Sequence, residues 1–207
     1  WVNGTTCIPA NESTRGAVVS ATNSLIGSTA SDQVGLQVLA LTNGNYIVRS
    51  QNWDNGGISN AGAVTWGNGT TGTTGAVSPA NSLVGSTAND FVGGTGIIAL
   101  TNGNYVVRSS SWDNGATANV GAVTWGNGTT GITGPVTTAN SLHGTTATDA
   151  VGINGIAALT NGNYVVASAN WDNGAVVDVG AVTWADWTTG ITGAITIANS
   201  LHGTTPT

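Results

Sequence analysis

The chain repeats itself with a period of 59 residues, and this feature restricts its fold more than any other. Trp53, Trp112 and Trp171 are spaced by 59 residues, and the tyrosines around them keep the same spacing. A fixed period indicates tandem structural units, each of which buries its apolar face against its neighbours. We expect a partial repeat with an insert at residues 1–34 and three repeats at 35–93, 94–152 and 153–207, the last incomplete at its end.

The composition indicates a folded protein made of strands. Only 6% of the residues are charged, against about a quarter in typical soluble domains. Disorder is nevertheless excluded, because 40% of the residues are hydrophobic and eight are Trp. Helix formers are scarce: the chain has one Glu, Glu12, and neither Lys nor Met, whereas Gly contributes 32 residues. Glycine and the abundant β-branched residues favour strands and tight turns, so the predicted class is all-β.

Each repeat is expected to hold four short strands. In the second repeat we place them at residues 96–101, 104–109, 121–125 and 134–142. Asn102-Gly103 between the first two strands is a strong hairpin signal, and Asn127-Gly128 marks another turn. Four antiparallel strands in about 60 residues match one blade of a β-propeller. The alternative is a β-solenoid, in which each repeat would make about three parallel coils.

These motifs resemble a known repeat. Each copy is similar to the FG-GAP repeat of integrin-α-type β-propellers, in the segment 90–93 (Asp-Phe-Val-Gly), the hairpin 100–107 and the Gly-Ala-Val strand at 121–123. The combination of Leu-Thr-Asn-Gly-Asn-Tyr-Val-Val, Trp-Asp-Asn-Gly and Gly-Ala-Val-Thr-Trp also resembles repeats of very large bacterial surface proteins, which often carry a filamentous-haemagglutinin-type secretion domain. The resemblance implies a propeller fold and an adhesin-like or surface-filament role.

One departure from FG-GAP repeats concerns metal binding. Their hairpin often carries an Asp-rich calcium loop, whereas residues 101–104 here read Thr-Asn-Gly-Asn and contain no carboxylate. Calcium prefers several oxygen ligands, including charged ones. Cys7 is the only cysteine, so thiolates cannot build a zinc site and no disulfide forms within the chain. We therefore expect no metal and no cofactor.

The segment Trp-Asp-Asn-Gly, which recurs once per repeat, is the candidate ligand site. An indole can stack on a sugar ring while Asp and Asn bind hydroxyl groups. The alternative, which we favour, is a structural turn in which Asp and Asn bond their own backbone and Trp packs in the core. On the same propeller face we expect Asp32, Asp90 and Asp149, which brings Asp90 close to Asp113. A metal or sugar site shared by these two acids is a weaker alternative. The candidate ligand-binding residues are Trp53, Asp54, Asn55, Trp112, Asp113, Asn114, Trp171, Asp172 and Asn173.

Two further sets of residues carry expectations. His143 and His202 stand where the other copies have aliphatic residues, which predicts a half-exposed strand position. Asn-X-Ser/Thr sequons predict sites where glycosylation is sterically feasible, two of them in the exposed turn after the third strand. The sequons are at Asn3, Asn11, Asn68 and Asn127.

The sequence contains no enzymatic signature. It has no phosphate-binding loop and no Ser-His-Asp set, and its polar features recur in every repeat, whereas an active site is one asymmetric constellation. With three cations and a net charge of −6 the chain is unsuited to nucleic acid, and no apolar run is long enough to cross a membrane. Catalysis, nucleic-acid binding and membrane insertion are therefore not expected.

The predicted function follows from the uncovered ends of a repeat array. Three blades alone leave apolar faces open, so we expect the chain to associate with itself or with adjacent repeats of a longer chain. Because it opens on Trp1 instead of Met, we expect a mature product or an excerpt of a longer protein. The predicted role is a structural or adhesive element of a secreted or cell-surface assembly. The alternative is a lectin-like propeller that binds glycans at one site per repeat.

Overall fold

The structure is a computed structural model of the chain, and it describes residues 18–205. Within this range it contains sixteen short strands and no helix, which confirms the all-β prediction. The strands of the first repeat and the segment before it are β1 (Leu25–Ile26), β2 (Gln37–Ala40), β3 (Tyr46–Ser50), β4 (Ala63–Gly67), β5 (Gly75–Ala76) and β6 (Ser82–Val84). Those of the second repeat are β7 (Gly96–Ala99), β8 (Tyr105–Ser109), β9 (Ala122–Gly126), β10 (Gly134–Pro135) and β11 (Ser141–His143). Those of the third are β12 (Ile156–Ala158), β13 (Tyr164–Ser168), β14 (Ala181–Ala185), β15 (Gly193–Ala194) and β16 (Ser200–His202).

Each repeat contributes four antiparallel strands to one sheet, as predicted. In the second repeat β8 pairs with β7 and β9, and β9 pairs with β11. The hairpin predicted at Asn102-Gly103 is confirmed: the Leu100 N–H donates to the Asn104 carbonyl at 2.8 Å, and Gly103 has a φ of 90°. A side chain would be strained at this φ, which explains why every copy of the hairpin carries Gly.

Residues 134–142, predicted to carry the fourth strand, do not form one continuous strand. The prediction of a single element is wrong. The segment is divided into β10 and β11 by a turn in which Asn140 Oδ1 accepts the Thr137 N–H at 2.8 Å. β11 joins the sheet of its own repeat, whereas β10 pairs in parallel with β6 of the preceding repeat. The Asn side chain replaces a strand hydrogen bond and bends the backbone, so that the chain crosses from one sheet to the next.

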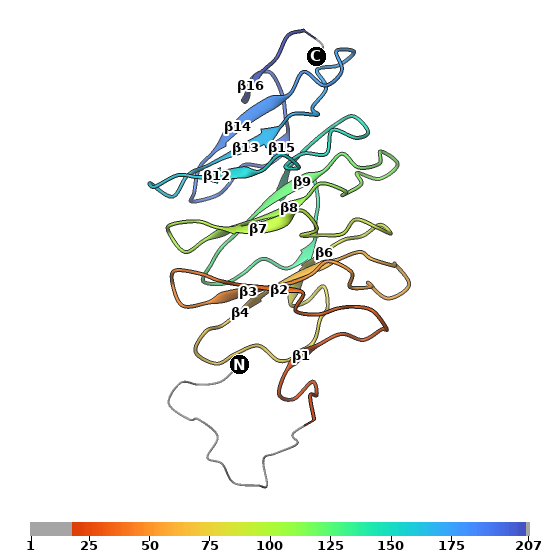
Figure 1. The fold of residues 1–207 in the computed structure, drawn as a ribbon, viewed down its shortest axis with the longest axis vertical. Helices are drawn as coiled ribbons and strands as arrows, with labels where there is room; N and C mark the ends of the chain where they lie inside the picture. The colour runs from red at the N-terminus through yellow and green to blue at the C-terminus, as the bar shows by residue number, and fades with distance from the viewer. Residues whose placement is uncertain (1–17, 206–207) are drawn as a thin grey trace.

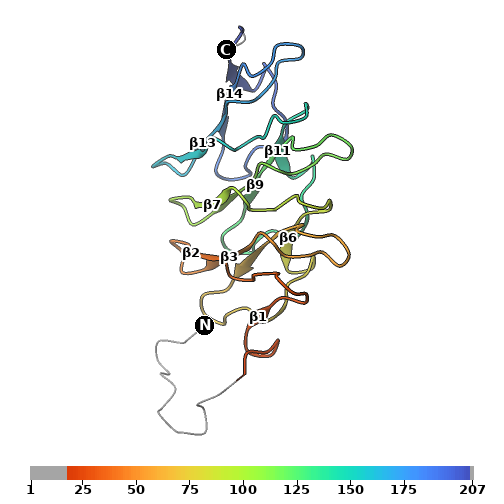
Figure 2. The same cartoon turned by 45° about the vertical axis from the view of Figure 1, so that its right-hand side comes forward.

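The repeats follow one another along the long axis of the molecule (Figures 1 and 2). The sheets have the strand orders β10-β6-β4-β3-β2, β15-β11-β9-β8-β7 and β12-β13-β14-β16. The parallel pairs β1–β5, β6–β10 and β11–β15 join neighbouring repeats. Hairpins therefore build each repeat, in contrast to the parallel coils of the solenoid alternative. Closure of these blade-like sheets around a central axis, which defines a propeller, stays a prediction.

The hydrophobic core lies between successive sheets. One cluster of buried residues joins Leu41, Ile47 and Val64 of the first repeat to Ile97 and Tyr105 of the second. A second cluster joins the second and third repeats in the same manner. Each repeat thus buries its apolar side chains against the next one, as expected for a tandem array.

Polar groups hold neighbouring repeats in register. The Gly128 carbonyl accepts hydrogen bonds from Asn43 Nδ2 and Asn45 Nδ2, both at 2.8 Å, and from Trp66 Nε1 at 2.9 Å. There is no room for a side chain here, because a Cβ on Gly128 would lie 1.7 Å from the Gly103 carbonyl oxygen. Glycine permits this close approach of two backbones, and the carbonyl it exposes is shared by three donors of the preceding repeat.

Candidate functional site

The tryptophan of each Trp-Asp-Asn-Gly segment is buried. Trp53, Trp112 and Trp171 are each 3% exposed and belong to three different core clusters. A sugar ring can stack on an indole only where a face of the indole is open to solvent. The stacking surface that a carbohydrate site at these segments would need is covered, and the three indoles are core residues.

The polar residues of the segment close their own loop. In the second repeat Asp113 accepts the Asn119 N–H at 2.7 Å, the Gly121 N–H donates to the Trp112 carbonyl at 3.0 Å, and Gly115 has a φ of 61°. Asp54 and Asp172 make the equivalent bonds at 2.8 Å. These features are those of the structural turn that the sequence favours. Asn55, Asn114 and Asn173 each form an isolated β-bridge within the loop.

A second aspartate of each repeat lies beneath this loop. Asp90 is 0% exposed. Its Oδ2 accepts the N–H groups of Ser86 and Thr87, both at 2.8 Å, and its Oδ1 accepts the Asp113 N–H at 3.0 Å. The expected proximity of Asp90 and Asp113 is therefore present, but the Asp90 carboxylate is engaged with backbone groups. Asp32 and Asp149 form the same three backbone hydrogen bonds in their copies.

The environment of these carboxyl groups changes their ionisation. Burial raises the pKa of Asp90 and of Asp149, and the backbone hydrogen bonds oppose this effect only in part. At Asp32 burial also acts to raise the pKa, but bonds from the Thr29 hydroxyl and from three backbone N–H groups outweigh it, and the pKa is lowered. Within residues 18–205 no group of three or more His, Cys, Asp or Glu side chains could hold a metal ion.

The two histidines pack against the buried tryptophans. The half-exposed position predicted for His143 is wrong, because this residue is 7% exposed. Its ring meets the Trp112 indole edge-on, with the ring centroids 6.2 Å apart, and His202 contacts Trp171 in the same way at 6.1 Å. His202 is half-buried. The difference arises because the third repeat covers His143, whereas His202 lies on the last sheet.

The two sequons within the described range form turns. Asn127 is half-buried, and its Oδ1 accepts the N–H groups of Thr129 at 2.7 Å and Thr130 at 3.2 Å. Asn68 makes the equivalent bonds, at 2.8 and 3.0 Å. These Asx turns account for Asn structurally, and glycosylation stays a prediction. The other two sequons, at Asn3 and Asn11, lie outside the described residues.

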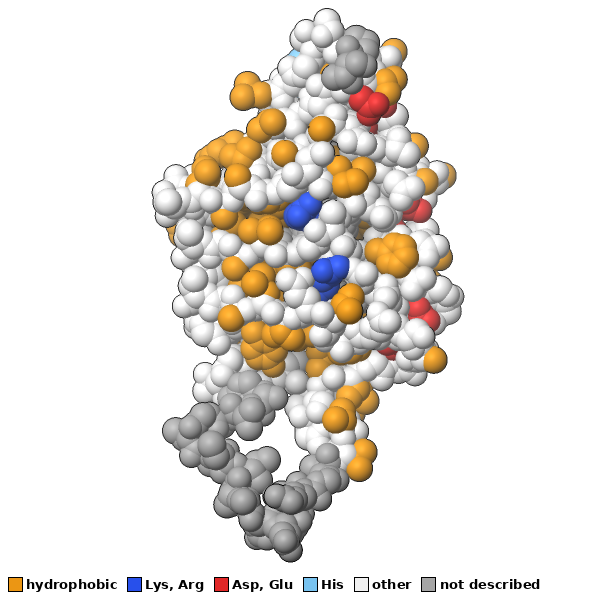
Figure 3. All heavy atoms as spheres, in the orientation of Figure 1, with side chains coloured by type: hydrophobic (Ala, Val, Ile, Leu, Met, Phe, Trp, Pro, Cys, Tyr) orange, Lys and Arg blue, Asp and Glu red, His pale blue; other side chains and the backbone are white. Residues whose placement is uncertain are grey.

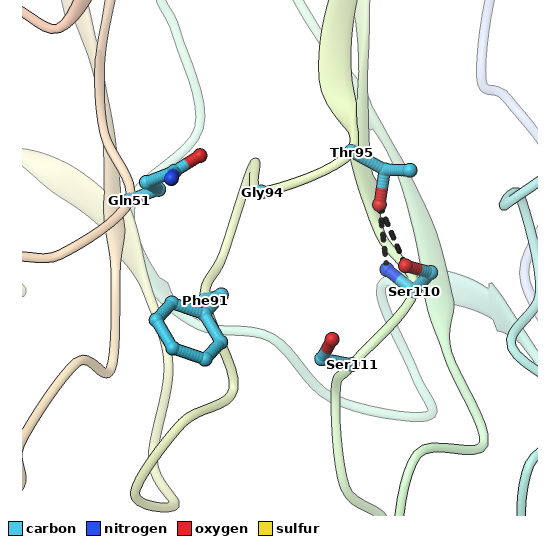
Figure 4. Close-up of a pocket in the computed structure, with 6 residues that line it drawn as sticks. All are labelled: Gln51, Phe91, Gly94, Thr95, Ser110 and Ser111. Carbon is cyan, nitrogen blue, oxygen red and sulfur yellow. Dashed lines mark hydrogen bonds between the residues drawn. The ribbon is translucent and has the colours of Figure 1, made fainter.

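A pocket that the sequence analysis missed lies at the junction of the first and second repeats (Figure 4). Its volume is about 270 Å³. The Phe91 ring forms one wall, and the hydroxyl groups lie on the other side of the opening. The available signal was that Phe91, the only Phe of the chain, aligns with Gln33 and Ala150 in the neighbouring copies. The lining residues are Gln51, Phe91, Gly94, Thr95, Ser110 and Ser111.

The two arginines of the described range also join repeats, and they lie one above the other on one face (Figure 3). Arg49 Nη2 donates to the Gly94 carbonyl at 2.9 Å, and Arg108 Nη2 donates to the Ile153 carbonyl at 2.8 Å. Burial lowers the pKa of both guanidinium groups, which stay cationic at neutral pH. The third repeat has Ala167 at this position. The arginines thus bridge the two internal junctions.

These features define an all-β tandem-repeat protein whose recurring aromatic and acidic residues hold the fold together. The chain belongs to the family described as "Repeat of unknown function (DUF5650)", which matches residues 1–36, 40–94, 99–153 and 158–207. The comparison with protein families gives no FG-GAP or integrin-like match, and that likeness stays a resemblance in motifs. A search of curated proteins finds no match to the chain. Among residues 18–205 there is no helix with the length and apolar character needed to cross a membrane.

Proposed function

We propose that the protein is a non-catalytic structural element of a secreted or cell-surface assembly and that it extends by stacking one repeat on the next. The observation that carries this proposal is the exposure of apolar side chains on the last sheet. At both internal junctions the equivalent side chains are buried by the following repeat, whereas on the last sheet they are exposed to solvent. The polar residues that recur in each repeat support a non-catalytic role, because they bond to the backbone of their own repeat or of the next one.

Equivalent residues show how strongly the environment differs. Leu83 and Leu142 are each 0% exposed, whereas Leu201 is 79% exposed. In the same way Val123 is 0% and Val182 43% exposed. The sequence around these residues is nearly unchanged, so the exposed area of the last sheet corresponds to the area that a following repeat covers at the internal junctions.

The opposite end of the stack presents the complementary surface. Val38 is 61% exposed, and Ile97 at the equivalent position of the second repeat is 5% exposed. The two ends therefore carry the two halves of one internal interface. Such a head-to-tail interface extends by repetition, and apolar patches of this kind mark association sites. The partner we propose for each end is another repeat, from a longer chain or from a second copy.

Several finer features of the proposal rest on indirect support. Low charge suits close assembly, because little like-charge repulsion opposes it. Closure of the array into a β-propeller is supported by the blade-like antiparallel sheets. An adhesive role is supported by the likeness of the motifs to bacterial surface repeats. The lectin alternative with one site per repeat loses support, because the indoles of Trp53, Trp112 and Trp171 are covered.

Extension of the chain by one repeat tests the proposal. A copy of residues 90–148 appended after Thr207 continues the 59-residue register, because Asp90 and Asp149 are equivalent. We expect the added repeat to cover β14 and β16 and to slow hydrogen–deuterium exchange in the peptide 181–202 by at least about tenfold. This peptide has a unique sequence in the extended chain, so mass spectrometry can follow it.

The control is a chain that carries the same appended residues in shuffled order, which cannot form the junction. Its exchange in the peptide 181–202 should equal that of the original chain. Unchanged exchange in the extended chain, with the added repeat itself protected, would show that repeats fold without stacking and would refute the proposal.

A further inference from the structure

We propose that the pocket between the first and second repeats binds one neutral sugar ring. This inference does not depend on the stacking of further repeats, because both repeats that form the pocket are present in the chain. It also differs from a lectin with one site per repeat, because it assigns a single site to residues outside the Trp-Asp-Asn-Gly segments.

The pocket combines an apolar wall with neutral hydrogen-bonding groups. The Phe91 ring is half-buried and forms one side, while Gln51 and the hydroxyl groups of Thr95, Ser110 and Ser111 surround the opening (Figure 4). A pyranose ring has an apolar C–H face that packs on an aromatic ring and hydroxyl groups that exchange hydrogen bonds with amide and hydroxyl side chains. The two kinds of wall match these two kinds of surface.

The polar wall is already ordered. Thr95 Oγ1 lies 2.8 Å from Ser110 Oγ and accepts the Ser110 N–H at 3.1 Å. Gln51 Oε1 accepts a hydrogen bond from Arg49 Nη2, and the same nitrogen donates to the Gly94 carbonyl. Groups fixed before binding lose little entropy when a ligand arrives.

The charge of the site favours an uncharged ligand. None of the six lining residues is ionisable. The nearby cation, Arg49, directs its Nη atoms at the oxygens of Gly94, Gln51 and Gln37. An anionic sugar would gain no free cationic partner here, so the pocket selects for a neutral ring.

The pocket is specific to one junction of an otherwise regular array. At the next junction Ala150 stands in the place of Phe91, and Ile153 stands in the place of Gly94. The aromatic wall is thus missing there, and a branched side chain replaces the glycine. The pocket with an aromatic wall is therefore a property of this junction and not of the repeat.

The backbone at Phe91 is set by the repeat and not by its side chain. Its φ is 44°, and the equivalent residues Gln33 and Ala150 have φ values of 48° and 45°. Every copy thus holds this position in the left-handed region, whichever side chain it carries. The core does not demand an aromatic side chain, since Gln and Ala serve at the same position. The ring remains available to a ligand.

The size of the pocket limits the ligand to one ring. Its volume of about 270 Å³ lies just below the range of about 300–1,000 Å³ that is typical of small-molecule sites. A single pyranose of about a dozen heavy atoms in such an open site is expected to bind with a dissociation constant on the order of 1 mM.

Titration of the full 207-residue chain with methyl glycosides of glucose, galactose, mannose and N-acetylglucosamine tests the site. The readout is the backbone amide shift in two-dimensional NMR spectra. We expect at least one glycoside to cause saturable shifts at Gly94, Ser110 and Ser111, with no shift at Ile153 of the next junction. Phe91→Ala should weaken this binding by at least about tenfold.

The chain offers matched controls for this variant. Ala already occupies the same backbone conformation at Ala150, so Phe91→Ala is expected to fold, and its unperturbed amide spectrum away from the pocket verifies this. Gln33→Ala changes the equivalent position outside the pocket and should leave binding unchanged. The proposal is overturned if no glycoside shifts these amides at tens of millimolar, or if the shifts persist in folded Phe91→Ala.

Discussion

Substitution of the leucine in the two Leu-His-Gly segments, Leu142 and Leu201, measures how much one repeat stabilises another. Leu142 is 0% exposed beneath the third repeat, whereas Leu201, in an identical local sequence, is 79% exposed on the last sheet. Truncation of a buried Leu to Ala costs about 2–5 kcal/mol, through lost transfer free energy and the cavity left behind. Truncation of an exposed residue changes stability by about 0.5 kcal/mol or less. Leu142→Ala should therefore lower the free energy of unfolding by at least about 2 kcal/mol, and Leu201→Ala should leave it nearly unchanged.

Urea denaturation followed by tryptophan fluorescence measures both variants under the same conditions. A stacked array need not unfold in one step, so the curves are fitted together with a nearest-neighbour scheme in which each junction has its own free energy. In this scheme Leu142→Ala weakens the junction of the second and third repeats and leaves the first junction intact.

The same pair of variants can be placed in the chain extended by residues 90–148. There Leu201 is expected to be covered, and Leu201→Ala should become as costly as Leu142→Ala. Equal costs of the two variants in the original chain would refute the reasoning, because they would show that the leucine contributes within its own sheet and not through the next repeat.

Two other predictions address the backbone and the buried acids. Gly128→Ala should strongly destabilise the junction of the first and second repeats, because its Cβ would lie 1.7 Å from the Gly103 carbonyl oxygen. Gly57→Ala, whose Cβ would have nothing within 4 Å, should leave stability unchanged. Equal melting temperatures of the two variants would contradict this. Burial raises the pKa of Asp90 above the ordinary value of 3.8, so its contribution to stability is complete below that value and is lost as the pH rises through the folded-state pKa. Asp90→Asn should remove this part of the pH dependence, and a difference in unfolding free energy between variant and original chain that does not change with pH would count against it.

Local sequence was sufficient to predict the repeating unit. The 59-residue period, the Asn-Gly hairpin and the alternation of β-branched residues with glycine-rich turns act over a few residues, and the four-stranded antiparallel sheet follows from them. The structural interpretation of the Trp-Asp-Asn-Gly segment could also be favoured from sequence, because Asp, Asn and Gly bend their own backbone. The choice between that interpretation and a sugar site could not be made, since it depends on whether the face of Trp112 is covered.

Contacts between neighbouring repeats determine the features that local sequence could not predict. β10 leaves its own sheet because its partner, β6, belongs to the preceding repeat, and the Phe91 pocket exists because residues of two repeats meet there. The clearest case is the sequence Ser-Leu-His-Gly-Thr-Thr, which occurs at residues 141–146 and again at 200–205. In both places it forms a strand, as its residues dictate. Only the presence of the next sheet determines that Leu142 is buried and Leu201 exposed, because hydrophobic burial is a property of two surfaces in contact.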